Sequence, residues 1–331
     1  MQFNRRLGKE TEAFTGQSIV QFIIKFRTVF ILIVLMLVFF GLNSLFLHPT
    51  NLLNMVKRMS YVLIPGFGMT FIITKGALDL SVGSIAAVVG VSFAMLIKGG
   101  AMPVVLAIFI TIAIALALGS LNGFVSVKGR IEPFLVTLAT MNIYRGLALT
   151  LAGGKPIFIA APGFTDMFGN GRVLGIIPTP VIILIIFFII TWFLFYKTKY
   201  GFYVRCIGGN PEAARVAGIN IDRIRIITFM ISALYACFAG FILAALMNGG
   251  LPDIGSDLAL DAISGVILGG TAIVGGFGSV WGTVGGCLIM ATMNSGMSLL
   301  GAQYPQQILV KGIVIILAVL MDNTLKSGLR R

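Results

Sequence analysis

The chain has 331 residues, of which 58% are hydrophobic and 11% are charged, and its mean hydropathy is +1.03. Soluble domains carry about 25% charged residues because their surface faces water, so this composition excludes a soluble globular protein. The formal net charge of +13 indicates no nucleic-acid partner, because the basic residues cluster in short segments between apolar runs, as they do in membrane proteins.

Long uncharged runs predict helices that cross a lipid bilayer. Residues 28–47 include twenty positions without a charge and residues 104–127 include twenty-four, and about 20 helical residues cross a bilayer core. The run VIILIIFFII at 181–190 lacks the alternation of a barrel strand. We therefore predict an all-α, polytopic membrane helical bundle. Ten spans are expected, over residues 28–47, 57–75, 83–97, 103–127, 133–152, 175–196, 225–248, 258–276, 280–300 and 306–322.

The first span is expected to be an anchor, because its apolar run exceeds the core of about 7–15 residues that a cleavable signal has. Ten spans place both termini on one side of the membrane. That side then holds seventeen of the lysines and arginines against five on the other side, and the positive-inside rule makes it cytoplasmic. We expect a cytoplasmic tail at 1–27, a transmembrane domain at 28–322 with a cytoplasmic loop at 197–225, and a cytoplasmic tail at 323–331.

Sequence motifs for catalysis and for nucleotide binding are absent. No segment matches G-x-x-x-x-G-K-[ST], H-E-x-x-H or G-x-S-x-G. The three cysteines and the single histidine follow no metal-ligand spacing. We therefore expect no catalytic residue and no metal site in this chain.

The segment GGNPEAARVAGIN, residues 208–220, predicts a short helix in the 197–225 loop. Asn210 suits the N-cap, Pro211 the first helical position, and Glu212 the first turn. Gly218 suits the end of the helix. Such a helix can dock into a groove on another protein, and a plain solvated connector is the alternative.

Glycine is concentrated at residues 265–286, which read GVILGGTAIVGGFGSVWGTVGG. Small residues let membrane helices approach closely, or let a helix break beside a translocation path, and both interpretations stay open. A weak internal echo relates residues 83–90 to residues 278–285 at a constant offset of 195. Transporters are often built from repeats.

Several blocks resemble ABC-transporter permeases of the branched-chain amino acid and sugar permease superfamily, and the ribose-type sugar permeases in particular. Residues 77–84, ALDLSVGS, resemble the block G-[IL]-D-L-S-V-G-S of that group, with Gly76 as the usual leading glycine and Ala77 following it. Residues 262–276 resemble its block A-x-x-x-V-I-L-G-G-T-x-x-x-G-G, and residues 294–323 fit its C-terminal block. The 208–220 segment resembles the coupling segment of these permeases, so the resemblance covers almost the whole chain.

The resemblance implies the permease subunit of an ATP-driven, binding-protein-dependent importer of ribose or a similar monosaccharide, in a bacterial inner membrane. It implies three protein partners: an ATP-binding cassette subunit that holds the ATP and magnesium, a periplasmic or lipid-anchored sugar-binding protein, and a second copy or a paralogue of the permease. This chain would then be a transport subunit surrounded by membrane lipid, without a cofactor of its own. The implied ATPase-coupling residues are Gly209, Asn210, Pro211, Glu212, Ala213, Arg215 and Gly218. The block residues that could line a translocation path are Asp79, Ser81, Gly83, Ser84, Gly269, Gly270, Gly275 and Gly276.

Charged residues near or within spans have structural and functional interpretations. Asp79 lies close to Lys75 in sequence, which favours an ion pair or a helix cap, and packing roles are favoured for Arg145 and Lys311 over bonds to a substrate. Two alternative functions stay open: a branched-chain amino acid permease of the same superfamily, and an ion-coupled secondary transporter. The latter would need carboxylates at the bilayer midplane, whereas the acidic residues here fall near span ends. The sequence does not choose among sugars, or between a homodimer and a heterodimer.

Overall fold

The computed structural model describes residues 28–314 and residue 316, which form a helical bundle and confirm the predicted all-α class. The predicted tails and the end of the last predicted span lie outside the described residues. The longer helices are Thr28–Leu42, α2 (Pro49–Thr74), α3 (Val82–Ile97), α4 (Val104–Lys128), α5 (Pro133–Ala152), α7 (Thr179–Lys197), α8 (Lys199–Gly209), α10 (Ile221–Leu246), α11 (Leu258–Leu268), α12 (Val280–Leu299) and residues 304–314. The short elements are η1 (Ser44–Leu47), η2 (Lys98–Gly100), β1 (Ile157–Phe158), α6 (Pro162–Thr165), η3 (Asp166–Asn170), β2 (Arg172–Val173), β3 (Ile177–Pro178), α9 (Pro211–Val216) and β4 (Gly249–Gly250).

The centre of the bundle is formed by α2, α3 and α10, which are buried over most of their length. Small residues allow their close contact: Gly68 of α2 packs on Ser232 of α10, and Gly240 of α10 packs on Ala86 of α3. Helices in a membrane associate through such close packing, because the hydrophobic effect does not drive one apolar helix against another when both are already surrounded by lipid.

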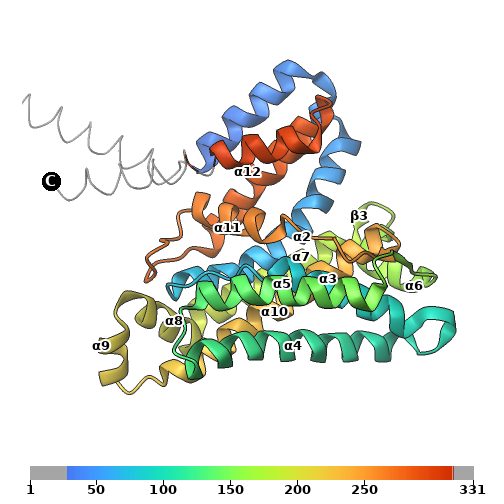
Figure 1. Cartoon of the computed structure of the whole chain (residues 1–331). Coiled ribbons are helices and arrows are strands. Elements are labelled where there is room, and N and C mark those ends of the chain that lie inside the picture. The colour runs from blue at the N-terminus through green and yellow to red at the C-terminus, as the bar shows by residue number, and fades with distance from the viewer. Residues whose placement is uncertain (1–27, 315, 317–331) are drawn as a thin grey trace, which may run out of the picture.

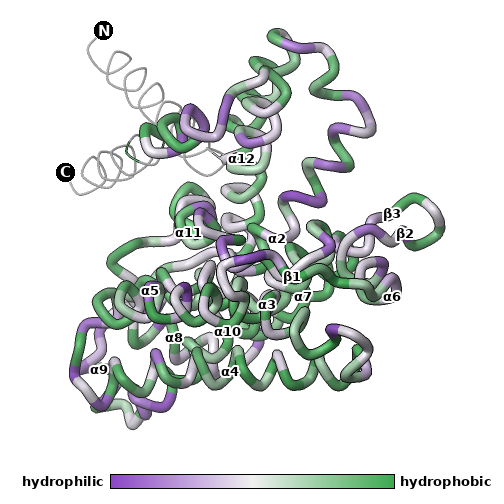
Figure 2. The backbone as a smooth tube through the Cα atoms, turned by 45° about the vertical axis from the view of Figure 1, so that its right-hand side comes forward, coloured by the Kyte–Doolittle hydropathy of each residue, from purple (hydrophilic) through white to green (hydrophobic). Residues whose placement is uncertain are grey.

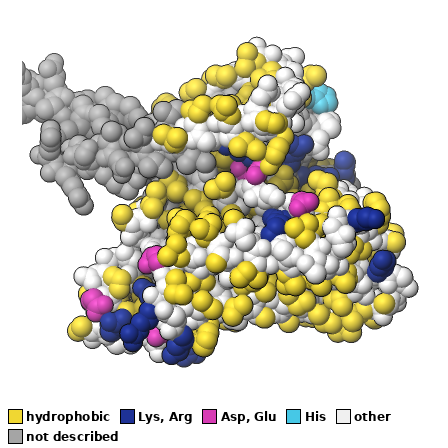
Figure 3. Space-filling view, in the orientation of Figure 1, with side chains coloured by type: hydrophobic (Ala, Val, Ile, Leu, Met, Phe, Trp, Pro, Cys, Tyr) yellow, Lys and Arg dark blue, Asp and Glu magenta, His cyan; other side chains and the backbone are white. Residues whose placement is uncertain are grey.

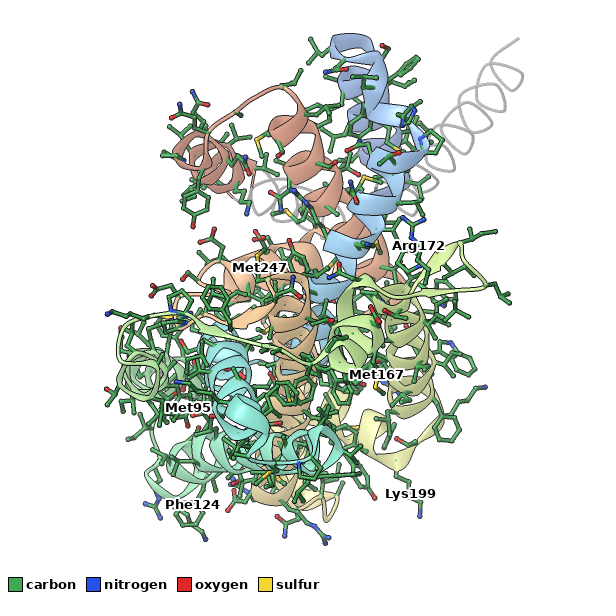
Figure 4. The ribbon with its side chains drawn as sticks, turned by 90° about the vertical axis from the view of Figure 1, so that its right-hand side faces the viewer. Met95, Phe124, Met167, Arg172, Lys199 and Met247 are labelled. Atoms are coloured by element: carbon green, nitrogen blue, oxygen red, sulfur yellow. The ribbon has the colours of Figure 1, made fainter. Side chains whose placement is uncertain are left out.

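The helices α4, α5 and α7 surround this centre and direct large apolar side chains outward. Val105, Phe109 and Phe124 of α4 are each more than half exposed, and Figure 2 shows hydrophobic residues along α4. Figure 4 places Phe124 at the outside of the molecule. Among the described residues, five helices are long and apolar enough to cross a membrane, namely α3 with η2, α4, α5, α7 and α10, so the exposed apolar faces of α4, α5 and α7 are surfaces for lipid.

A second group of helices lies beside this layer. Figure 1 shows α12 close to the blue helix Thr28–Leu42, above the layer of α3, α4, α5 and α10. Gly296 of α12 packs on the ring of Phe39, and a small core of Met290, Met293 and Met297 fills the space between the two helices. The long helix α2 joins the two groups, because it packs on both α12 and α10.

The chain between α2 and α3 enters the bundle without forming a helix. In this segment, residues 75–81, the carboxylate of Asp79 accepts a hydrogen bond from the Ser232 hydroxyl at 2.8 Å. Ser232 lies eleven residues into α10, which is about 16 Å at ~1.5 Å per residue. The start of α3 therefore lies about 16 Å from the level at which α10 begins, which is about half the thickness of the hydrocarbon core of a bilayer.

A comparable break comes from the opposite end of the bundle, after α10. Strand β4 packs beside Gly90 and Ala94 of α3, and residues 251–257 then follow α3 back to its N-terminus, where Gly255 meets Gly83. A Cβ on Gly83 would collide with the carbonyl oxygen of Gly255, so this backbone contact requires glycine. The helix α11 begins just after this point, and its eleven residues reach only about 16 Å.

The predicted helical span over 258–276 is therefore wrong in its second half. The helix ends at Leu268, and residues 269–279 turn back to α12. The physical reason is backbone conformation, since Gly270, Gly275 and Gly276 all adopt φ values between 82° and 89° that no α-helix contains. The two similar sequence segments, 83–90 and 278–285, occupy corresponding positions in the fold, because residue 83 lies at the start of α3 and residue 278 lies just before α12.

The end of the bundle opposite α9 is closed by short elements. β1 pairs with β4 and β2 pairs with β3, both antiparallel. Phe164 of α6 stacks on Phe93 of α3 with ring centroids 4.0 Å apart, and Phe168 of η3 and Phe241 of α10 complete the cluster. Each such aromatic pair adds about 0.5–1.5 kcal/mol beyond its buried area, so this cluster attaches the 162–170 segment to the bundle.

Candidate functional site: the coupling helix and the block residues

The helix α9 forms as its caps predict. The side chain of Asn210 accepts a hydrogen bond from the Ala213 N–H at 3.0 Å, Pro211 occupies the first turn, and the helix ends at Val216. Gly218, with φ of 80°, turns the chain toward Asn220, whose side chain caps α10 through the Arg223 N–H at 3.0 Å. The predicted loop contains a second helix, however, because α8 fills residues 199–209 and is capped by Thr198.

The surface of α9 is exposed. Its ion pair joins Glu212 to Arg215 at 3.1 Å, with side chains 75% and 63% exposed, and Val216 is 90% exposed. Such an ion pair contributes little to folding, about 0.2–1 kcal/mol. Only Ala214 of the helix is buried. Figure 3 shows charged side chains gathered at this end, and Figure 4 shows Lys199, at the start of α8, directed away from the molecule. The exposed face is therefore available to another protein.

The end of α8 meets both interrupted spans at one backbone contact. The Gly276 N–H donates to the carbonyl oxygen of Thr74, the last residue of α2, at 2.8 Å. A Cβ on Gly208 would collide with that same oxygen and with the Gly276 nitrogen. We call this contact of Gly208, Thr74 and Gly276 the glycine joint. It connects the α8–α9 pair to the 75–81 and 269–279 segments without an intervening side chain.

Asp79 lies in a buried hydrogen-bond network at the start of α3. Its Oδ1 accepts from the N–H of Ser81 at 3.0 Å and from the Ser81 hydroxyl at 2.6 Å, and its Oδ2 accepts from Ser232. Asn122 of α4 donates to the Ser81 hydroxyl, and the hydroxyl of Tyr144 of α5 donates to Asn122. The network therefore joins four helices, α3, α4, α5 and α10, at one depth.

The expected ion pair between Asp79 and Lys75 is not formed within the described residues. The ammonium of Lys75 instead lies over the ring of Phe229, 4.0 Å from its centroid, and 3.5 Å from the carbonyl oxygen of Arg225. Asp79 is not the N-cap of α3 either, since Ser81 occupies that position. Hydrogen bonds from Ser81 and Ser232 stabilise the Asp79 carboxylate where a cation was expected. The sequence contains no spacing that would have predicted Ser232 as a partner.

The other block residues divide between packing and cavity lining. Gly269 packs on Gly282 across the α11–α12 contact, and Gly275 and Gly276 pack on Gly208 and Gly209. Close packing is thus the role that the structure shows for these glycines. Gly83 and Ser84, in contrast, line a cavity between α3 and α5.

A basic cavity adjoins α9. It has a volume of about 460 Å³ and lies where α4 ends and α5 and α10 begin. Its lining includes four cations and two acids, Lys75, Arg130, Arg215, Arg225, Glu132 and Asp222. Sequence reasoning missed this cavity, because its residues come from four separate segments.

The model of a protein family described as "Branched-chain amino acid transport system / permease component" matches residues 51–319. Three similar proteins carry names of sugar permeases. The ribose import permease protein RbsC of Bacillus subtilis (strain 168) is 40% identical over 299 residues, which cover 90% of this chain and 91% of that protein. RbsC of Escherichia coli (strain K12) is 37% identical over 90% of this chain and 93% of its own length. The L-arabinose permease protein AraH of Azospirillum brasilense is 36% identical over 88% and 86%. No solved structure matches this chain.

Proposed function

Because this chain belongs to the family of branched-chain amino acid transport system permease components, we propose that it is the membrane-spanning permease subunit of an ATP-driven importer of a monosaccharide, ribose first. The observation that carries the mechanism is the glycine joint. It attaches an exposed helix pair, α8–α9, directly to the 75–81 and 269–279 segments.

The joint supports coupling between ATP hydrolysis and transport. A separate ATP-binding cassette subunit would dock on α9 and move it when ATP binds and is hydrolysed. Because Gly208 contacts Thr74 and Gly276 through backbone atoms, a displacement of α8 moves the 75–81 and 269–279 segments with it. Such a partner shifts the equilibrium between two states only through contacts that differ between them, and α9 offers its exposed ion pair and Val216 for those contacts.

The proposed topology has ten membrane segments, with both termini and α9 in the cytoplasm of a bacterial cell. The excess of lysine and arginine on that side supports this orientation. The interrupted segments at 75–81 and 251–257 enter from opposite ends, as the two halves of transporters with broken helices do. The chain would lie in the inner membrane, with the 1–27 and 323–331 tails in the cytoplasm.

The partners follow from the same assignment. ATP and magnesium would be held by the ATP-binding subunit, while this chain would bind neither and hydrolyse nothing. A sugar-binding protein would deliver the substrate to the end of the bundle formed by β1–β4 and β2–β3. A second permease copy or a paralogue would complete the channel.

The test is uptake of labelled ribose into vesicles that hold this chain, its ATP-binding subunit and its binding protein. The proposal expects uptake that disappears when ATP or the binding protein is omitted. Uptake of another monosaccharide from a panel would support the same mechanism with a different sugar as substrate. Uptake of branched-chain amino acids alone would show that the substrate is an amino acid and not a sugar. An assembled complex that carries none of these would contradict the proposal.

The coupling role of α9 is tested by Glu212→Lys. The substitution changes the exposed charge of the helix and leaves the core untouched, so the free energy of unfolding should change by less than about 0.5 kcal/mol. Uptake should be lost while the permease remains folded in the membrane. The control is Lys128→Glu, another exposed charge reversal at the same end of the bundle but outside α9. Wild-type uptake by the Glu212→Lys variant would show that α9 does not couple.

A further inference from the structure

The two interrupted spans meet at a polar cavity in the middle of the bundle. This inner cavity has a volume of about 150 Å³ and is lined by Leu80, Gly83 and Ser84 from the start of α3, Met141, Asn142 and Arg145 from α5, and Ser256 before α11. The starts of α3 and α11 both lie next to it, since Gly83 contacts Gly255. Helices that begin inside a membrane direct unpaired N–H groups and the positive end of their dipole toward such a space.

Ser84 provides an independent indication that a ligand belongs there. Its side chain is 1% exposed, and its hydroxyl oxygen has no hydrogen-bond partner among the described residues. A buried hydroxyl without a partner costs about 1–3 kcal/mol, and the energy is recovered when a molecule in the cavity bonds to it. Neither N-cap residue, Ser81 or Asp257, bonds through its side chain to the first turn of its helix, although the Leu258 N–H of α11 donates to the carbonyl oxygen of Gly255 at 3.0 Å.

Arg145 fixes the wall of the inner cavity. Its Nη1 donates to the carbonyl oxygens of Pro252 and Ile254, which holds the 251–257 segment against α5. The other guanidinium N–H groups make no hydrogen bond within the described residues, and a guanidinium has five donors in all. On the same helix, Asn142 is exposed and uses its amide nitrogen for Leu138, so that its carbonyl oxygen is available.

An outer cavity adjoins the inner one, and Ser256 lines both. It has a volume of about 310 Å³, which lies in the range of small-molecule sites, ~300–1,000 Å³. Its polar groups include Asp257, bonded to the Tyr304 hydroxyl at 2.7 Å, and Asp261, paired with Lys311 at 2.9 Å. Figure 3 shows acidic and basic side chains close together in the middle of this face.

The charges along the two cavities balance. Three acids, Asp253, Asp257 and Asp261, stand against three cations, Arg58, Arg145 and Lys311. A free anion would meet the three carboxylates, and a free cation would meet the three basic groups. A neutral molecule with many hydroxyls fits such a lining, because each hydroxyl both donates and accepts.

We propose that the inner cavity, with Ser84, Asn142, Arg145 and Ser256, is a transient binding site for the hydroxyl groups of a neutral monosaccharide in transit, and that the outer cavity is its entrance. This inference rests on the proposed function and names the residues that contact the substrate. Ser84 and Asn142 bond to sugar hydroxyls, and Arg145 donates from the nitrogens that the backbone does not use.

The experiment compares Ser84→Ala and Asn142→Ala with wild type in vesicles that hold the complete importer, with uptake of labelled ribose and ATP hydrolysis measured together. Each variant should lower ribose uptake about three- to ten-fold, the effect of one hydrogen bond of ordinary strength, and leave ATP hydrolysis unchanged. Ser84→Ala removes a hydroxyl that has no partner in the protein, so thermal stability should not fall. The matched control is Ser92→Ala, two turns further along α3, which lines neither cavity and should transport at the wild-type rate.

Deoxyribose analogues identify the contact. The proposal expects one analogue, lacking the hydroxyl that Ser84 bonds, to be carried equally by wild type and Ser84→Ala. Wild-type uptake by both variants, or equal losses for ribose and every analogue, would overturn the inference and leave the proposed function standing. If the wild-type importer carries no sugar at all, the proposed function fails first and this inference fails with it.

Discussion

Asp79 secures the start of α3 by hydrogen bonds from two serines. Asp79→Ala would leave the Ser81 N–H and the hydroxyls of Ser81 and Ser232 without their acceptor. Each unpaired buried donor costs about 1–3 kcal/mol, so with three donors we expect the free energy of unfolding to fall by at least about 3 kcal/mol and uptake to be lost. Asp79→Asn keeps one oxygen as an acceptor and should be less damaging. Thermal unfolding of the purified permease measures both.

The control for these variants is Asp166→Ala. The Asp166 side chain is exposed, and its carboxylate makes no hydrogen bond within the described residues. Unfolding of Asp79→Ala at the wild-type temperature would show that the network contributes nothing to stability.

At the same scale, the caps of α9 could be predicted from sequence and the partners of Asp79 could not. Asn210, Pro211 and Gly218 act on neighbours within three residues, so their effect is visible in a short segment. Asp79 meets Ser232 across 153 positions of the chain. The nearby Lys75 suggested a local ion pair, but the fold directs its ammonium to Phe229 instead.

At the scale of elements, the glycine joint predicts opposite outcomes for two adjacent glycines. Gly208→Ala would place a Cβ against the Thr74 carbonyl and the Gly276 nitrogen, whereas nothing lies within 4 Å of a Cβ at Gly209. We expect Gly208→Ala to lose uptake and to lower the free energy of unfolding by about 1–3 kcal/mol, as overpacking does. Gly209→Ala should behave as wild type. Uptake and thermal unfolding of this pair test the joint, and equal behaviour of the two variants would contradict it.

The helices with long apolar runs could be predicted, and the interrupted ones could not. The boundaries of α4 and α5 lie within one residue of the predicted spans. The run at 258–276 is also largely apolar, but its helix stops at Leu268, because the glycines that follow adopt positive φ. Hydropathy reports whether a segment avoids water, and it contains no information about backbone conformation. The family resemblance indicated Gly83 and Ser84, but the residues lining the two cavities come from separate segments, so sequence order did not indicate that they lie together.

At the scale of the whole molecule, the outward faces of α4, α5 and α7 predict where a charge is tolerated. Ala113 is exposed near the middle of α4, whereas Leu174 is exposed in the turn between β2 and β3. Ala113→Lys should cost about 2.5–3.5 kcal/mol of insertion free energy, because lysine at a helix centre must enter lipid. Leu174→Lys should cost nothing measurable. The fraction of each variant that resists alkaline extraction from membranes measures the difference, and equal fractions would show that the face of α4 does not meet lipid.

The balance of charges along the inner and outer cavities has an electrical consequence. A protein that opens a polar path through a membrane risks a leak of ions, which would dissipate the membrane potential at a cost of about 2.3 kcal/mol per charge and 100 mV. Rings of one sign conduct ions of the other sign. Here both signs line the two cavities, with Asp253, Asp257 and Asp261 beside Arg58, Arg145 and Lys311, so neither sodium nor chloride finds a lining of counter-charges alone. The lining proposed to accommodate a sugar therefore also hinders the passage of ions.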